Sequence, residues 1–143
     1  MVNKILIASD HAGFDLKQQL IKKMPELIFD DLGTDSKESV DYTDYANELS
    51  NKLLKNSNIK GVLICGTGVG MSIAANKFNN IRAGLVYNSK VAKLIREHND
   101  ANILVLPGKY IDIKEAIKSV DYFIKTSFEG GRHINRINKM MKK

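Results

Sequence analysis

The chain has 143 residues, of which 43% are hydrophobic and 27% are charged, so it fits one soluble domain over residues 1–143. Its composition argues against a membrane span, a secretory signal peptide and an internal disulfide, so we expect a cytoplasmic protein without a membrane partner. The net charge is +6, and no acidic residue follows Glu129. Such a basic C-terminal segment could bind an anionic metabolite or a nucleic acid, or could simply keep the protein soluble.

Short apolar runs alternate with amphipathic segments along the chain. We expect strands at 4–8, 27–33, 61–64, 81–86 and 102–106, and helices at 14–24, 42–55 and 89–99. Further helices should follow the third strand, where one carries Ile73, Ala74, Ala75 and Phe78, and begin at about 112 and near 129 or 130. Pro25 ends the first helix, and Ser89 is the expected cap of the fourth. Nearly continuous apolar strands are typical of parallel strands buried on both faces, so the pattern predicts an α/β fold around a parallel sheet.

A glycine-rich turn joins the third strand to a helix. Gly66, Gly68 and Gly70 stand at every second position after Cys65, the only cysteine. Amide N–H groups at such a turn, helped by the helix dipole, attract negative charge and favour a thiolate over a thiol. A base beside an anion hole can move a proton next to a carbonyl. From these residues alone, a plain turn with a core cysteine is an equally open interpretation.

Two better-known glycine motifs do not fit this turn. A dinucleotide fingerprint needs glycine at Met71 and an acidic residue about 20 positions on, but residues 81–90 contain none. A P-loop needs a Gly-Lys-Ser/Thr sequence, which is absent. The three histidines show no metal-ligand spacing. We therefore expect neither a nucleotide cofactor nor a metal.

Other polar residues stand at the ends of the expected elements. Asp10 and His11 follow the first strand and should share a rim of the sheet with the glycine turn; Asp10 could cap a helix or bind a hydroxyl. His98, at a helix end, suits acid–base chemistry or a favourable place in the helix dipole. Arg132 and Arg136 share a helix face, which fits a phosphate or a solvated basic surface.

Taken together, residues 9–13, 64–77, 97–102 and 128–133 closely resemble the motifs of the ribose-5-phosphate isomerase B family, in the expected order. The resemblance covers nearly the whole chain. It implies a three-layer Rossmann-like fold with a five-stranded parallel sheet, forming a single sugar-phosphate isomerase domain that needs no cofactor. It also implies interconversion of D-ribose 5-phosphate and D-ribulose 5-phosphate, a step of the non-oxidative pentose phosphate pathway, by ring opening and an enediolate.

The resemblance also assigns roles to residues. Cys65 matches the base that moves the proton between C2 and C1; another version of the family uses a glutamate where this chain has Met71. His98 matches the acid that protonates the ring oxygen, and Thr67 matches a residue that assists near the sugar. The substrate-binding positions would be the amides of Gly66, Gly68, Val69 and Gly70, and the side chains of Asp10, His11, Tyr42, Asn99, Lys109, Arg132 and Arg136.

Two positions depart from the family pattern. Lys109 stands where many members have a phosphate-binding arginine, so the charge is kept and the bidentate fork is lost. Thr43 replaces a proline often seen after Tyr42, which could loosen that loop. Members of the family are homodimers or homotetramers, and the resemblance implies that His98 and Cys65 of one site come from different subunits, with the C-terminal helix on the partner.

Two other functions stay open on the sequence. A hexose 6-phosphate isomerase, acting on allose or galactose 6-phosphate, would use the same chemistry. A non-catalytic module that binds sugar phosphates or nucleic acid would explain the basic C-terminus. The presence of Cys65, Thr67 and His98 together favours catalysis, so we expect a sugar-phosphate substrate and no nucleic-acid partner.

Overall fold

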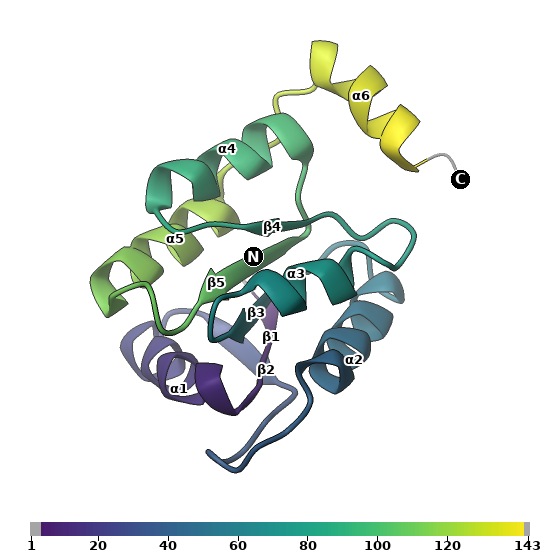
Figure 1. Cartoon of the computed structure of the whole chain (residues 1–143). Helices are drawn as coiled ribbons and strands as arrows, with labels where there is room; N and C mark the ends of the chain where they lie inside the picture. Colours follow the sequence, from purple (N-terminus) through teal and green to yellow (C-terminus); the bar gives the residue numbers. More distant parts are fainter. Residues whose placement is uncertain (1–3, 142–143) are drawn as a thin grey trace.

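A computed structural model describes residues 4–141 of the chain. In chain order its elements are β1 (Lys4–Ser9), the short 3-10 helix η1 (His11–Gly13), α1 (Phe14–Lys23), β2 (Ile28–Asp31), α2 (Tyr42–Leu54), β3 (Lys60–Cys65), α3 (Val69–Ala75), β4 (Ala83–Leu85), α4 (Ser89–Asn99), β5 (Ile103–Pro107), α5 (Ile113–Lys125) and α6 (Arg132–Met141) (Figure 1). Strands and helices alternate as expected from the sequence. None of the helices within 4–141 combines the length and apolar character needed to cross a bilayer.

The five strands form one parallel sheet in the order β2-β1-β3-β5-β4. The central strand β3 pairs with β1 on one side, with Ser9 opposite Ile64, and with β5 on the other, with Cys65 opposite Pro107. The carboxyl ends of these three strands therefore lie together at one edge. Parallel α/β sheets bind ligands beyond this edge.

Helices cover both faces of the sheet, which confirms the three-layer architecture. One apolar cluster joins α1, α4 and α5 to the face that carries Val62 and Ile64. The other joins α2 and α3 to the face that carries Leu63 and Cys65. Because side chains alternate along a strand, successive residues of β3 serve opposite layers. Cys65 is thus part of the layer beneath α2 and α3.

The cap of α4 differs from the sequence-based expectation. Asn88, not Ser89, is the N-cap, and its side chain accepts a hydrogen bond from the Val91 amide at 3.0 Å. Ser89 is the first helical residue, and its amide instead donates to the Glu115 carboxylate of α5 at 2.5 Å. Hydrogen bonds from Ser89 hold the pKa of Glu115 below its ordinary value. The start of α4 is therefore fastened to α5.

Lys17 is a charged residue of α1 that lies inside the fold. Its side chain is fully buried under α1, and Nζ donates to the Asp31 carboxylate at 2.6 Å and to the Thr34 carbonyl at 2.7 Å. A buried ammonium group needs such partners, since burying it unpaired would be costly. Lys17 thereby holds the start of the loop that precedes α2.

Helix α6 stands apart from the body of the molecule, beyond the end of α4 (Figure 1). Among residues 4–141, neither apolar cluster includes a residue of α6. Two of its hydrophobic side chains are instead open to solvent, with Ile134 48% and Met140 50% exposed, while Ile137 and Met141 are half-buried. An amphipathic helix with an uncovered apolar face normally buries that face against another surface.

Candidate active site

Three segments meet at the carboxyl edge of the sheet, around the end of β3. The Asp10 amide donates to the Ile64 carbonyl at 3.2 Å, which brings the segment after β1 against β3. From the other side, the amides of Gly108 and Lys109 donate to the carbonyls of Cys65 and Gly66, at 2.8 and 3.0 Å. The sequence-based expectation that the segments after β1 and β3 share a rim is confirmed.

The glycine turn makes a tight connection from β3 into α3. Gly68 has φ of +79°, a left-handed conformation that side chains disfavour, and it packs against Leu85 and Leu106. The Thr67 hydroxyl accepts a hydrogen bond from the Val69 amide at 3.2 Å. The Tyr87 hydroxyl donates to the Thr67 carbonyl at 2.9 Å from the other side.

The turn therefore has the geometry of an anion-binding loop. Gly68 is the N-cap of α3 and has no side chain to cap the helix. Within residues 4–141, no backbone acceptor is paired with the amides of Gly66, Thr67 or Gly68. Free amide groups gathered at one turn can stabilise negative charge on a bound group.

Cys65 lies directly before this turn and is only 5% exposed. Its neighbours in the apolar layer include Leu63, Met71 and Ala75, which keep bulk water away from the thiol. A thiolate is the nucleophilic and basic form of cysteine. A shielded sulfur beside free amides is therefore placed for proton transfer to and from a small bound molecule.

Asp10 and His11 line the same edge, each with a defined hydrogen bond. The Asp10 carboxylate accepts from the Gly13 amide at 3.0 Å, so of its two expected roles helix capping is confirmed. Nδ1 of His11 accepts from the Val40 amide at 3.2 Å. Because Nδ1 acts as the acceptor, Nε2 carries the proton of a neutral ring and can donate to a ligand.

Tyr42 and Lys109 each lie against a glycine of the turn. A Cβ placed on Gly70 would lie 2.5 Å from Cζ of Tyr42, so the phenol ring rests against the backbone of Gly70. A Cβ on Gly66 would lie 3.6 Å from Cδ of Lys109. A groove of about 470 Å³ runs beside Tyr42 and Gly70 between α2 and α3.

His98 and Asn99 do not join this group within one chain. Helix α4 runs antiparallel to the strands, so its last residues lie at the amino edge of the sheet. The Asn99 carbonyl there accepts from Nε of Arg82, which precedes β4, at 3.1 Å. From Lys60 to Cys65, β3 rises by five residue steps of about 3.3 Å, so the two edges are roughly 16 Å apart. Cys65 and His98 of one chain thus face different ends of the molecule.

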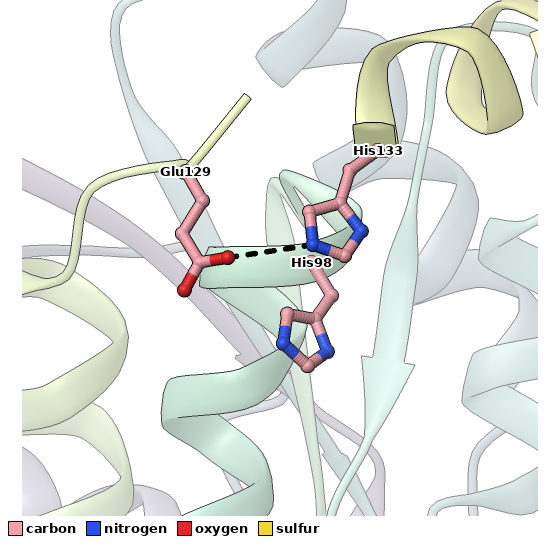
Figure 2. Close-up of side chains that lie close together, drawn as sticks. All are labelled: His98, Glu129 and His133. Atoms are coloured by element: carbon pink, nitrogen blue, oxygen red, sulfur yellow. Dashed lines mark ion pairs between the residues drawn. The ribbon is translucent and has the colours of Figure 1, made fainter. Parts of the chain in front are cut away.

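Around His98, the structure gathers residues that sequence reasoning did not assign to the site. The rings of His98 and His133 stack with centroids 4.6 Å apart, and Oε1 of Glu129 lies 3.4 Å from Nε2 of His133 (Figure 2). The sequence feature that could have indicated this group is the spacing of Glu129 and His133, which stand four positions apart. Arg132 and Arg136, on the adjoining helix α6, are exposed.

A second cavity, of about 620 Å³, also lies at the amino edge, away from Cys65. It is lined by Lys60, Arg82 and Arg96, together with Asp100. Burial lowers the pKa of the Lys60 amine from its ordinary value, and the nearby charge of Arg96 lowers it further. Asp100 pairs with both arginines, at 3.4 and 2.8 Å.

Comparison with known proteins agrees with this geometry. The model of the family described as Ribose/Galactose Isomerase matches residues 5–140. The chain belongs to this family. The probable ribose-5-phosphate isomerase B of Mycoplasma pneumoniae is 46% identical over 144 residues, covering 99% of this chain and 95% of that protein.

Solved structures of the ribose/galactose isomerase family superpose closely on the chain. The ribose 5-phosphate isomerase of Thermotoga maritima has a TM-score of 0.93 and 50% sequence identity, and the match covers 96% of each chain. Ribose-5-phosphate isomerase B of Mycoplasma genitalium, solved with bound ribulose-5-phosphate, has a TM-score of 0.91 and 44% identity, covering 96% of this chain and 93% of that one.

Proposed function

We propose that the chain is an isomerase that interconverts D-ribose 5-phosphate and D-ribulose 5-phosphate. The observation that carries the proposal is the shielded thiol of Cys65 beside the free amides of the glycine turn. Aldose–ketose isomerisation needs a base and an oxyanion hole at one place. Full-length relatives of this chain are named as ribose-5-phosphate isomerases, which supports the pentose phosphate over other sugars.

The proposed reaction begins with opening of the furanose ring. His98 gives a proton to the ring oxygen as the ring C1–O bond breaks, and the C1 hydroxyl loses its proton to water, which leaves an open-chain aldehyde. The Cys65 thiolate then takes the proton from C2, and the electron pair moves to the C1 oxygen to form an enediolate. The free amides of Gly66, Thr67 and Gly68 stabilise that charge, whereas the Val69 amide is already bonded to the Thr67 hydroxyl. The thiol returns its proton to C1 while a proton moves from the C2 hydroxyl to the C1 oxygen, which yields the ketose and regenerates the thiolate.

The proposed site combines groups from two subunits. Cys65, His11 and Tyr42 lie at the carboxyl edge of one chain, while His98 lies at the amino edge, next to α6. A homodimer or homotetramer in which α6 packs on a partner would bring the two sets together and cover the apolar face of α6. We place this assembly in the cytoplasm.

The substrate contacts follow from the same assembly. Asp10 and Asn99 would bind sugar hydroxyls. The phosphate would lie between His11 and Lys109 of one subunit and Arg132 and Arg136 of the other, since two guanidinium groups one helical turn apart suit a phosphate. No metal takes part in this scheme.

The decisive experiment compares wild type with Cys65→Ala for ribulose 5-phosphate formation from ribose 5-phosphate in the presence of a chelator. We expect the variant to lose turnover but keep substrate binding, because the thiol is not a main binding group. Ser50→Ala is the matched control: Ser50 is buried in α2, its hydroxyl has no partner within 4–141, and it should keep full activity.

Two results would overturn parts of the proposal. Near-normal turnover by Cys65→Ala would remove the cysteine as the base. A higher catalytic efficiency of the wild type with allose 6-phosphate or galactose 6-phosphate would replace the pentose by a hexose substrate.

A further inference from the structure

Three side chains with metal-binding atoms gather where α4 ends and α6 begins. They are His98 of α4, Glu129 of the preceding loop and His133 of α6 (Figure 2). One potential ligand atom from each lies within 4.8 Å of the other two. Backbone bonds fix the segments that carry them, because the Glu129 amide donates to the Glu97 carbonyl at 3.1 Å and the His133 amide to the Gly130 carbonyl at 3.1 Å.

The pair Glu129 and His133 already has the spacing of two zinc ligands. Oε1 of Glu129 and Nε2 of His133 are 3.4 Å apart. Two ligands on a tetrahedral zinc ion at about 2.0–2.1 Å each are roughly 3.4 Å from one another. The same distance is too long for a charge-assisted hydrogen bond, which is about 2.7–2.9 Å between nitrogen and oxygen. The two groups are therefore neighbours without being well bonded.

His133 provides the second, independent observation. The residue is 6% exposed, and its Nε2 is buried without a hydrogen-bond partner among residues 4–141. A buried polar atom left unpaired costs free energy, so native proteins pair nearly all of them. This nitrogen points toward the Glu129 carboxylate (Figure 2). A cation between them would satisfy both groups.

His98 would supply the third ligand after a small movement. Its ring is stacked on that of His133 with an angle of 18° between the planes, whereas an imidazole nitrogen binds a metal in the plane of its own ring. One ring must therefore turn out of the stack. His98 is partly exposed whereas His133 is buried, so His98 is the ring that would turn. The positive charge of Arg132 would repel a bound cation. Its side chain is exposed, so water and salt screen this repulsion.

We propose that His98, Glu129 and His133 form a binding site for a divalent transition-metal ion, with Zn²⁺ as the representative ion. Two histidines and one glutamate are a known zinc donor set, and three protein ligands leave a fourth position open. The consequence for catalysis rests on the proposed function. If His98 is the acid that opens the sugar ring, the bound ion occupies the nitrogen that must carry the proton, so the ion inhibits the isomerase.

Metal binding can be tested without any activity measurement. The full-length, metal-free protein is titrated with Zn²⁺ by calorimetry and with Co²⁺ by visible absorption, which reports tetrahedral coordination. We expect one ion per chain. Glu129→Gln and His133→Gln should each weaken binding by about tenfold or more, since even changes around metal ligands have effects of this size. Glu97→Gln, one residue from His98, is the matched control and should bind as wild type does.

Several outcomes separate the possibilities. No saturable binding by the wild type, or equal binding by His133→Gln, would overturn the proposal. Loss of binding in Cys65→Ala would also overturn it, because the ion would then be held by the thiol. In the isomerase assay, Zn²⁺ should inhibit the wild type, and Glu129→Gln should shift the inhibition curve by the same factor as its loss of affinity. Metal binding without isomerase activity in chelator would refute the proposed function alone.

Discussion

Mixing two inactive variants should restore isomerase activity if the site is shared between subunits. Cys65→Ala removes the base at the carboxyl edge, and His98→Asn removes the acid at the amino edge. Every site in either homodimer lacks one of these groups. In a heterodimer, one site carries both changes and the other carries neither.

The expected recovery follows from counting sites. After random exchange of equal amounts, about half of the dimers are heterodimers, and each has one intact site of two. Activity per chain should therefore rise to about one quarter of the wild-type value. The two variants are unfolded and refolded together, and ribulose 5-phosphate formation is followed in chelator.

A mixture of Cys65→Ala with Cys65→Ser is the control, because no pairing of these chains creates an intact site. If the first mixture stays as inactive as the control although heterodimers are detected, the two groups do not act across a subunit interface. One of the two residues would then have no part in the reaction, because Cys65 and His98 of one chain lie at opposite edges of the sheet, roughly 16 Å apart along β3.

Three further variants test other parts of the structure. Lys17→Met should lower the free energy of unfolding, measured in urea, by ~2–3 kcal/mol. The loss is smaller than for a fully buried pair because Asp31 is 37% exposed and can be rehydrated. An unchanged urea midpoint would contradict this prediction. Gly70→Ala should raise KM by pushing the Tyr42 ring away while changing stability by only about 1 kcal/mol, and a normal KM would show that the ring does not touch substrate. Arg136→Ala should weaken substrate binding by about 1.5–3 kcal/mol, roughly 10- to 150-fold, as a calorimetric titration would show; unchanged affinity would place the phosphate elsewhere.

The sheet and the carboxyl edge could be predicted because they depend on local patterns. Residues 61–64 and 103–106 are uninterrupted apolar runs, and such runs between amphipathic helices are typical of central parallel strands. Once the strands are parallel, the residues that follow them must share an edge. That argument placed Asp10 and Cys65 together without any knowledge of the strand order.

Contacts between distant segments could not be predicted in this way. His133 reaches His98 because the chain returns past α4 after α5, and no periodicity encodes that path. Lys17 lies on the buried side of α1, and its charge can be buried because the Asp31 carboxylate and the Thr34 carbonyl, both on later segments, accept hydrogen bonds from it. Both cases depend on a partner far away in the sequence.

The separateness of α6 has a consequence for how the protein opens. Within residues 4–141, neither apolar cluster includes a residue of α6, so detachment of residues 132–141 removes nothing from either core. Segments with few buried apolar contacts open at a lower free-energy cost than the core does. The helix that exposes Ile134 and Met140 should therefore exchange its amide hydrogens faster than the strands do, and association with a partner should slow that exchange.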